Sequence, residues 1–371
     1  MAKLGDIATY INGYAFKPQD WSDEGIPIIR IQDLTGNSYQ ANRYNGEYAS
    51  KYEVNDGDVL ISWSASLGVY IWHGEKAVLN QHIFKVVFDK ERISKDFFVH
   101  QVGLILENAA SDAHGATMKH LTKPVFDALP FYLPPYEKQC EIAGILDKVT
   151  SLISLRKQQL AKLDELVKAR FVEMFGDPVV NSKRWPVETI ENHIDLLTGF
   201  PFDSSGYVSK GVNICGGLII MPQKIDWSAC KHWPQITGYE DYILRPNDIV
   251  IALDRPWISN GFKIAMVDRE HLPALLIQRT ARIRAVDINQ HYLMQSLLLG
   301  RFDKHCNITG SLVPHISPKD IKSYSVMIPP IELQNQFASF VERVDQQKQT
   351  VQQSLEKLEL MKKALMQEYF G

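Results

Sequence analysis

Residues 134–176 read PPYEKQCEIAGILDKVTSLISLRKQQLAKLDELVKARFVEMFG, and residues 329–371 read PPIELQNQFASFVERVDQQKQTVQQSLEKLELMKKALMQEYFG. Both stretches begin with a Pro-Pro pair, place Glu and Gln at the same early positions, and end in Phe-Gly. The offset between them is 195 residues throughout, with no gap. A chain that contains one long stretch twice is best understood as a repeat.

Each stretch has the spacing of a long amphipathic helix. In the second stretch, Phe337 and Val344 begin a series of apolar residues that recurs every seven positions. In the first, apolar residues recur at steps of three and four, but Val149 and Leu160, and likewise Leu152 and Leu163, are eleven positions apart, which indicates a stutter. Each helix of about 38 residues would be ~57 Å long at 1.5 Å per residue. Two such helices with matched apolar faces are expected to pack together as a coiled coil.

The segments before the two helices also resemble each other. Gly199-Phe200-Pro201-Phe202 stands where Gly13-Tyr14-Ala15-Phe16 stands, and RPNDIVIA (245–252) echoes NDGDVLIS (55–62). The offset varies from 186 to 197 within these segments and returns to 195 in the helices. Their short β-like runs and single helical segments show no βαβ rhythm, which predicts an α+β fold. The pattern is that of variable globular domains on a spacer of fixed length.

The composition limits the class of protein. The 371 residues suggest about two domains, and the net charge of −3 leaves neither half basic. No apolar run is long enough to span a membrane, and MAKLGDIATY at the N-terminus lacks a secretory signal. The four cysteines show no paired spacing, so we expect reduced thiols, a cytoplasmic location and no metal site.

One local match suggests catalysis. Leu133-Pro134-Pro135-Tyr136 resembles the (Asn/Asp/Ser)-Pro-Pro-(Tyr/Phe) motif of amino-methyltransferases, in which a polar first residue accepts a hydrogen bond from the extruded base. Leucine cannot accept that bond, and a glycine-rich nucleotide loop is absent as well. The Pro-Pro pairs are better explained as helix starts, where a missing N–H costs nothing. We therefore expect no catalytic residues and no cofactor in this chain.

The order of these features resembles the DNA specificity subunit of type I restriction–modification systems. The resemblance covers the whole chain: a Gly-x-x-Phe-like opening, a G-D-V-L-I-S-like strand, a late polar loop, a Pro-Pro-x-Glu-x-Gln helix start, and MFGDPVVNSKRWP after the first helix. It implies two target recognition domains in tandem, 1–133 and 190–328. It also implies two spacer helices, 134–176 and 329–371, in an antiparallel coiled coil, with a connector at 177–189. One departure is Gln278-Arg279, which stands where the first copy has Gln81-His82.

The resemblance also implies partners. Each recognition domain would read one half of a split, asymmetric site in double-stranded DNA, and the coiled coil would set the gap. Two methyltransferase subunits would dock on this frame, and restriction–translocation subunits would join them. S-adenosylmethionine, ATP and Mg²⁺ would be used by those partners. The C-terminus should lie near the start of the first recognition domain.

Loops with donors, acceptors and cations are the candidates for DNA contact, since bases are read by hydrogen bonds and phosphates by Lys and Arg. The first-half candidates are Lys17, Ser62, Trp63, Gln81, His82, Lys119, His120 and Lys123. The second-half candidates are Arg255, Trp257, Asn260, Lys263, Gln278, Arg279, Ser311, His315 and Lys319. Two alternative functions stay open: a coiled-coil interaction protein without a DNA role, and a methyltransferase with a degenerate active site.

Overall fold

The computed structural model describes residues 1–36, 42–112, 122–306 and 315–371. Contacts divide the chain into two compact units, residues 1–157 with 353–371, and residues 158–352. Each unit contains one globular domain together with part of both long helices. The division into five segments made from the sequence stays a prediction. Among the described residues, no helix combines the length and apolar character needed to span a membrane.

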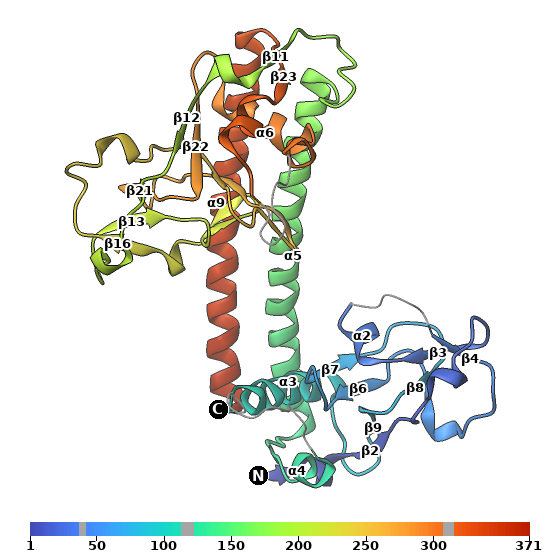
Figure 1. Ribbon diagram of the computed structural model, residues 1–371. Helices are drawn as coiled ribbons and strands as arrows, with labels where there is room; N and C mark the ends of the chain where they lie inside the picture. Colours follow the sequence, from blue (N-terminus) through green and yellow to red (C-terminus); the bar gives the residue numbers. More distant parts are fainter. Residues whose placement is uncertain (37–41, 113–121, 307–314) are drawn as a thin grey trace. The chain divides into compact units, whose positions relative to one another are not determined.

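The globular domain of the first unit contains two four-stranded sheets (Figure 1). The first sheet, in the order β2-β9-β6-β7, is antiparallel, whereas the second, β4-β3-β8-β5, contains the parallel pair β3–β8. The strands are β1 Ala2–Lys3, β2 Thr9–Asn12, β3 Ile26–Ile29, β4 Arg43–Tyr44, β5 Glu53–Val54, β6 Val59–Ser62, β7 Gly68–Ile71, β8 Ala77–Leu79, β9 Ile83–Val87 and β10 Pro130–Phe131. The helices are α1 Leu4–Ile7, α2 Ile31–Leu34, α3 Lys95–Asp112 and α4 Lys123–Asp127, with 3₁₀ turns η1 Pro18–Asp20 and η2 Ser50–Tyr52.

The second unit repeats this arrangement. Its antiparallel sheet, β12-β22-β17-β20, corresponds to the first sheet of the first unit, and its sheet β16-β13-β21 again contains a parallel pair. The strands are β11 Val187–Thr189, β12 Ile194–Thr198, β13 Val212–Cys215, β14 Ile220–Met221, β15 Lys224–Ile225, β16 Lys231–Trp233, β17 Ile249–Ala252, β18 Trp257–Ile258, β19 Gly261–Phe262, β20 Ile264–Met266, β21 Ala274–Leu276, β22 Thr280–Ala285 and β23 Ser325–Met327. The helices are α6 Gln290–Leu299, α7 Phe302–His305 and α8 Pro318–Lys322, with 3₁₀ turns η3 Ile190–His193, η4 Ser204–Gly206, η5 Trp227–Ala229 and η6 Glu240–Tyr242. The expected α+β tandem repeat is confirmed.

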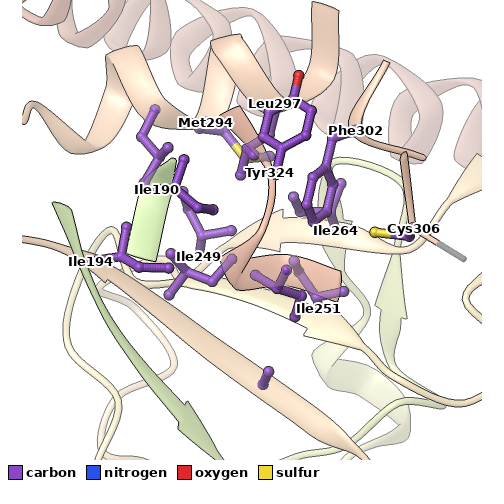
Figure 2. Packing of buried hydrophobic residues seen from close by; sticks show 14 of the residues in the cluster. Ile190, Ile194, Ile249, Ile251, Ile264, Met294, Leu297, Phe302, Cys306 and Tyr324 are labelled. Carbon is purple, nitrogen blue, oxygen red and sulfur yellow. The ribbon is translucent and has the colours of Figure 1, made fainter. Parts of the chain in front are cut away.

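Buried apolar side chains on one face of the antiparallel sheet hold the helices against it. In the second unit, Ile249 and Ile251 from β17 lie beneath Leu297 of α6, Phe302 of α7 and Tyr324 (Figure 2). The first unit uses β6 and β9 in the same way, packed against Phe97 and Phe98 of α3. Strands β6 and β17 are buried along their whole length, because their other face packs as well: Leu60 of β6 and Val250 of β17 each lie in a second core.

The long helices are α5 Tyr136–Phe175 and α9 Ile331–Phe370, each 40 residues long. Within the second unit, Val167 and Phe171 of α5 share a core with Phe337 and Val344 of α9. Within the first unit, Ile142 and Leu146 of α5 lie in a core against which Leu365 and Tyr369 of α9 pack. In both units the start of one helix therefore pairs with the end of the other, which confirms the antiparallel coiled coil.

Two sequence expectations inside these elements are wrong. Leu152, placed on the apolar face of the first helix, is 43% exposed, because the apolar face is interrupted by the stutter between Val149 and Leu163. The run IPIIRIQDL (26–34), whose β-like composition predicts a single strand, forms strand β3 only as far as Ile29 and then helix α2 from Ile31. The backbone N–H of Arg30 donates to the Asp33 carboxylate at 2.8 Å, and this cap begins the helix.

A buried glutamine joins each globular domain to the start of a long helix. Gln139 accepts a hydrogen bond from the Ser94 backbone N–H at 3.0 Å and donates to the Pro134 carbonyl at 2.9 Å. Gln334 accepts from the Asn289 N–H at 2.8 Å and donates to the Pro329 carbonyl at 2.8 Å. Ser94 and Asn289 immediately precede α3 and α6, so the repeated Pro-Pro-x-Glu-x-Gln pattern fixes the domain on its helix.

The aromatic residue at the end of each long helix makes a second joint. Phe175 of α5 packs edge-to-face on Tyr292 of α6, with ring centroids 4.8 Å apart. Phe370 of α9 packs in the same way on Phe97 of α3 at 5.4 Å. The C-terminal end of α9 thus packs within the first unit, as expected. Each globular domain is held by the beginning of one long helix and the end of the other.

Candidate nucleic-acid interface

The same backbone frame supports the candidate loops in both domains. Tyr14 N–H donates to the Leu79 carbonyl at 2.8 Å, and Phe200 N–H donates to the Leu276 carbonyl at 3.0 Å. Glycine precedes each aromatic residue, because a Cβ at Gly13 or Gly199 would lie 2.0 Å from a carbonyl oxygen of the neighbouring strand. The repeated Gly-aromatic opening is therefore required by close backbone approach.

One residue in each domain adopts a left-handed backbone conformation at the end of the antiparallel sheet, where two loops meet. His82 and Arg279 have φ of +72° and +64°, and each lies immediately before a central strand. Their carbonyls accept hydrogen bonds from Trp63 at 3.2 Å and from Leu253 at 2.9 Å, residues that follow the neighbouring strand. The structure thus brings the 62–63 loop to 81–82, and the 253–255 loop to 278–279.

In the first domain, these loops contain one buried candidate and three that are partly exposed. Ser62 is fully buried, and its hydroxyl donates to the Ser66 carbonyl. Its side chain therefore supports the turn and is not accessible to DNA. The Trp63 indole stacks on Phe84 at 5.6 Å and donates to the Asn12 side-chain oxygen at 3.2 Å. The His82 ring lies edge-on to Trp63 at 5.0 Å. Gln81 is half-buried, and its backbone N–H donates to the Tyr14 carbonyl at 2.8 Å.

The first-domain lysines differ in their surroundings. Lys17 is exposed beside turn η1, where it suits contact with a phosphate. Lys123 forms an ion pair with Asp127 at 2.7 Å and lies 5.6 Å from the centroid of the Tyr10 ring. Lys119, His120 and Ser311 lie outside the described residues.

In the second domain, a carboxylate that the sequence did not suggest joins two of the candidates. Asp254 Oδ2 lies 3.2 Å from Arg279 Nε, and Asp254 Oδ1 lies 2.6 Å from His315 Nδ1. The Arg279 side chain is 75% exposed and that of His315 is 43% exposed, whereas Asp254 is 28% exposed. The arrangement presents a guanidinium and an imidazole at the surface on one partly buried acid.

The remaining second-domain candidates range from buried to exposed. Lys263 is buried, and its ammonium donates to the Gly217 carbonyl, so it holds the turn at Gly217 and has no open face toward DNA. Burial lowers the pKa of this ammonium. Trp257 is half-buried and packs on Phe262 at 5.2 Å in the β18–β19 hairpin. The exposed candidates are Arg255, Asn260, Gln278 and Lys319.

A cavity of about 520 Å³ on the second domain has mixed charge. Arg282 is paired with Asp195, and Arg284 makes two hydrogen bonds of 2.7 Å to the buried Asp248. The Asp248 hydrogen bonds raise the pKa of Arg284, whereas burial is the main cause that lowers the pKa of Arg282. Within the described ranges, no cluster of three or more His, Cys, Asp or Glu side chains could hold a metal ion.

Comparison with known proteins places this architecture in a family. The family model described as the type I restriction modification DNA specificity domain matches residues 1–165 and 236–360. The chain belongs to this specificity family. The match includes both the opening of the first domain and the sheet and loops of the second that carry Arg279 and His315.

Two type I specificity subunits are similar to this chain in sequence. One is the type I restriction enzyme MjaVIII specificity subunit of Methanocaldococcus jannaschii, 25% identical, with 99% of this chain and 90% of the relative covered. Another is the type I restriction enzyme EcoBI specificity subunit of Escherichia coli, 29% identical over 61% of this chain and 44% of the relative.

Solved structures agree with the fold of this specificity protein. The S subunit of a type I restriction–modification system from M. genitalium covers all of this chain and 95% of its own length, with a TM-score of 0.60 and 13% identity. A chain from a structure on complex assembly and conformational transition of the type I R-M system covers all of this chain and 96% of its own, with a TM-score of 0.54 and 15% identity. At these identities the likeness concerns the fold.

Sequence reasoning missed Asp254 for a clear reason. Its counterpart in the first domain is the buried Ser64, so the repeat does not mark this position. The available signal was its place directly after the strand-like run RPNDIVIAL (245–253) and directly before the candidate Arg255. Leu218 was also missed. It is 88% exposed and follows Gly217, where an added Cβ would lie 3.8 Å from the Arg279 carbonyl oxygen.

Proposed function

We propose that this chain is the non-catalytic subunit that gives a type I restriction–modification complex its DNA sequence specificity. Each recognition domain reads one half of a split, asymmetric site in double-stranded DNA. The observation that carries this proposal is one backbone frame built twice with different side chains at its loops. A shared frame lets both domains approach a groove in the same way, and different side chains select different bases.

The long helices act as a spacer between the two half-sites. They have the same length, and each is joined to a domain by the same buried glutamine and the same terminal aromatic residue. With both joints fixed, the number of helical turns sets the separation of the two reading surfaces. The protein therefore fixes the number of base pairs between the half-sites without contacting the edges of those bases. Dimeric DNA-binding proteins fix the spacing of their half-sites in the same way.

Two methyltransferase subunits and the restriction–translocation subunits complete the complex. S-adenosylmethionine, ATP and Mg²⁺ are used by those subunits. Docking surfaces are provided by the long helices, where apolar side chains such as Leu155 and Leu360 are 57% and 68% exposed.

Methyl transfer gives a direct test of the assignment. The purified chain should transfer no methyl group, whereas its complex with the methyltransferase subunit should methylate a two-part sequence in duplex DNA. Methyl transfer by the chain alone would support the degenerate methyltransferase instead. If neither the chain nor the complex bound duplex DNA in a salt-sensitive way, an interaction protein without a DNA role would be favoured.

Helix insertions test the spacer. Lys157 of α5 and Glu359 of α9 form an ion pair of 3.0 Å, so they mark facing positions. Inserting seven residues after Lys157 and seven before Glu359 keeps the apolar face in register. Two extra turns add about 10 Å, or about three base pairs, to the gap. Methylation mapping should find both half-sites unchanged and the gap longer; altered half-sites would contradict the spacer role.

A further inference from the structure

We infer that Arg279 of the second recognition domain reads a guanine, and that Asp254 and His315 hold it in position to do so. This inference rests on the proposed function and names one base that its second half-site must contain. The argument depends on the geometry around a single carboxylate.

Asp254 approaches Arg279 most closely on the Nε side of the guanidinium. The shortest distance of the ion pair, 3.2 Å, joins Arg279 Nε to Asp254 Oδ2, so this closest contact is not made by the two terminal amino groups. Those two groups form the planar fork that matches O6 and N7 of guanine in the major groove. At 75% exposure, the side chain is open to a ligand while its inner nitrogen is held.

His315 fixes the same carboxylate from the other side. A carboxylate only accepts hydrogen bonds, so the 2.6 Å contact with Asp254 Oδ1 requires a proton on His315 Nδ1. The backbones of Asp254 and His315 also form a β-bridge, and Ile316 N–H donates to the Leu253 carbonyl at 2.8 Å. The carboxylate is therefore anchored before any DNA arrives, and holding a flexible arginine in advance lowers the entropy cost of binding.

The first domain lacks this device although its backbone frame is the same. Ser64 corresponds to Asp254 and is buried, and His82 corresponds to Arg279. At these corresponding described positions, only the second domain therefore has a guanidinium held by a carboxylate. A substitution at Arg279 should alter one half-site and leave the other unchanged.

A selection from a random-sequence duplex pool tests this inference. Duplexes that bind the full-length chain in complex with its methyltransferase subunits are recovered from the pool. The enriched sequences are then compared between wild type and variants. Wild type should enrich a two-part sequence with a guanine in one half. Arg279→Ala should lower discrimination at that base pair by about 10- to 100-fold and leave the other positions unchanged.

Companion variants separate reading from stability. Arg279→Lys keeps the charge without the fork, so it should retain overall affinity but not the guanine preference. Asp254→Ala should reduce discrimination at the same base pair several-fold, whereas a merely structural role would weaken binding to all sequences equally. Arg269→Ala is the matched control: this exposed arginine lies in the turn after β20, at the opposite end of the sheet, and should change nothing.

The outcomes distinguish this inference from the proposed function. If the wild-type complex enriches no two-part sequence, the proposed function fails and this inference fails with it. If wild type enriches a two-part sequence that Arg279→Ala enriches unchanged, or if His82→Ala alters the same base pair, only this inference is overturned.

Discussion

The two recognition domains share a frame and differ in what the frame presents. Gly13 and Gly199 make the same close approach, His82 and Arg279 the same left-handed turn, and Gln139 and Gln334 the same joint to a long helix. At the loop ends, the first domain places the Trp63–His82 ring pair, and the second places Arg279 and His315 on Asp254. Residues that build the frame recur because backbone geometry requires them, whereas residues that meet a ligand are free to diverge.

The largest difference in stability between the domains should come from matched ion pairs in their sheets. Asp248 is 2% exposed, accepts two hydrogen bonds from Arg284 and caps the backbone N–H of Arg245. Removing it leaves the partly buried Arg284 guanidinium, 21% exposed, without its partner, so Asp248→Ala should lower the free energy of unfolding by about 3 kcal/mol. Asp58, which pairs with Lys85 at 2.9 Å, is 24% exposed, so Asp58→Ala should cost only about 1 kcal/mol.

Chemical denaturation of both variants, followed by circular dichroism, measures this difference. Asp56→Ala is a suitable control in the first domain, because that carboxylate is exposed on the same turn. Equal losses in Asp248→Ala and Asp58→Ala would contradict the assigned difference in burial.

The glutamine joints should respond alike in the two domains. Gln139→Ala and Gln334→Ala each remove one acceptor and one donor and leave a buried backbone N–H unsatisfied, so each should lower stability by about 1–3 kcal/mol. The measurement is the midpoint of thermal unfolding for each variant beside wild type.

Neighbouring exposed glutamates provide the controls, since Glu137→Ala and Glu332→Ala leave both glutamine joints intact. A loss confined to one of the two glutamines would show that the joints are not equivalent, and would weaken the argument for a spacer fixed at both ends.

The smallest expected effect is a loss of folding stability at acidic pH. Burial lowers the pKa of His291 in α6, and its Nε2 is buried without a hydrogen-bond partner in the described structure. Below about pH 6.5 the unfolded chain takes up a proton that folded His291 resists, so stability falls as the pH falls. The corresponding residue in the first domain is Asp96.

Unfolding at pH 7 and pH 5.5 should therefore show a smaller acid loss in His291→Gln than in wild type. His73→Gln, which changes an exposed histidine of the first domain, is the control. If His291→Gln loses as much stability as wild type on acidification, burial of this imidazole does not contribute to acid sensitivity.

The antiparallel pairing of the long helices came only from the family resemblance, whereas the sequence by itself determined the tandem repeat and the two helices of equal length. These features are local or periodic: apolar spacing, Pro-Pro helix starts and Phe-Gly ends are visible without knowing what lies opposite. The predicted range 134–176 and the helix Tyr136–Phe175 differ by only two residues at its start and one at its end.

Only the tertiary structure decided which polar side chains face outward. Ser62 and Lys263 resemble Asn260 and Arg279 in chemical type, yet the first two bond backbone carbonyls inside the domain. Asp254 gains its position from Arg279 and His315, residues 25 and 61 positions away. Such contacts between distant segments depend on how strands and loops meet, and a single sequence holds no local signal for them.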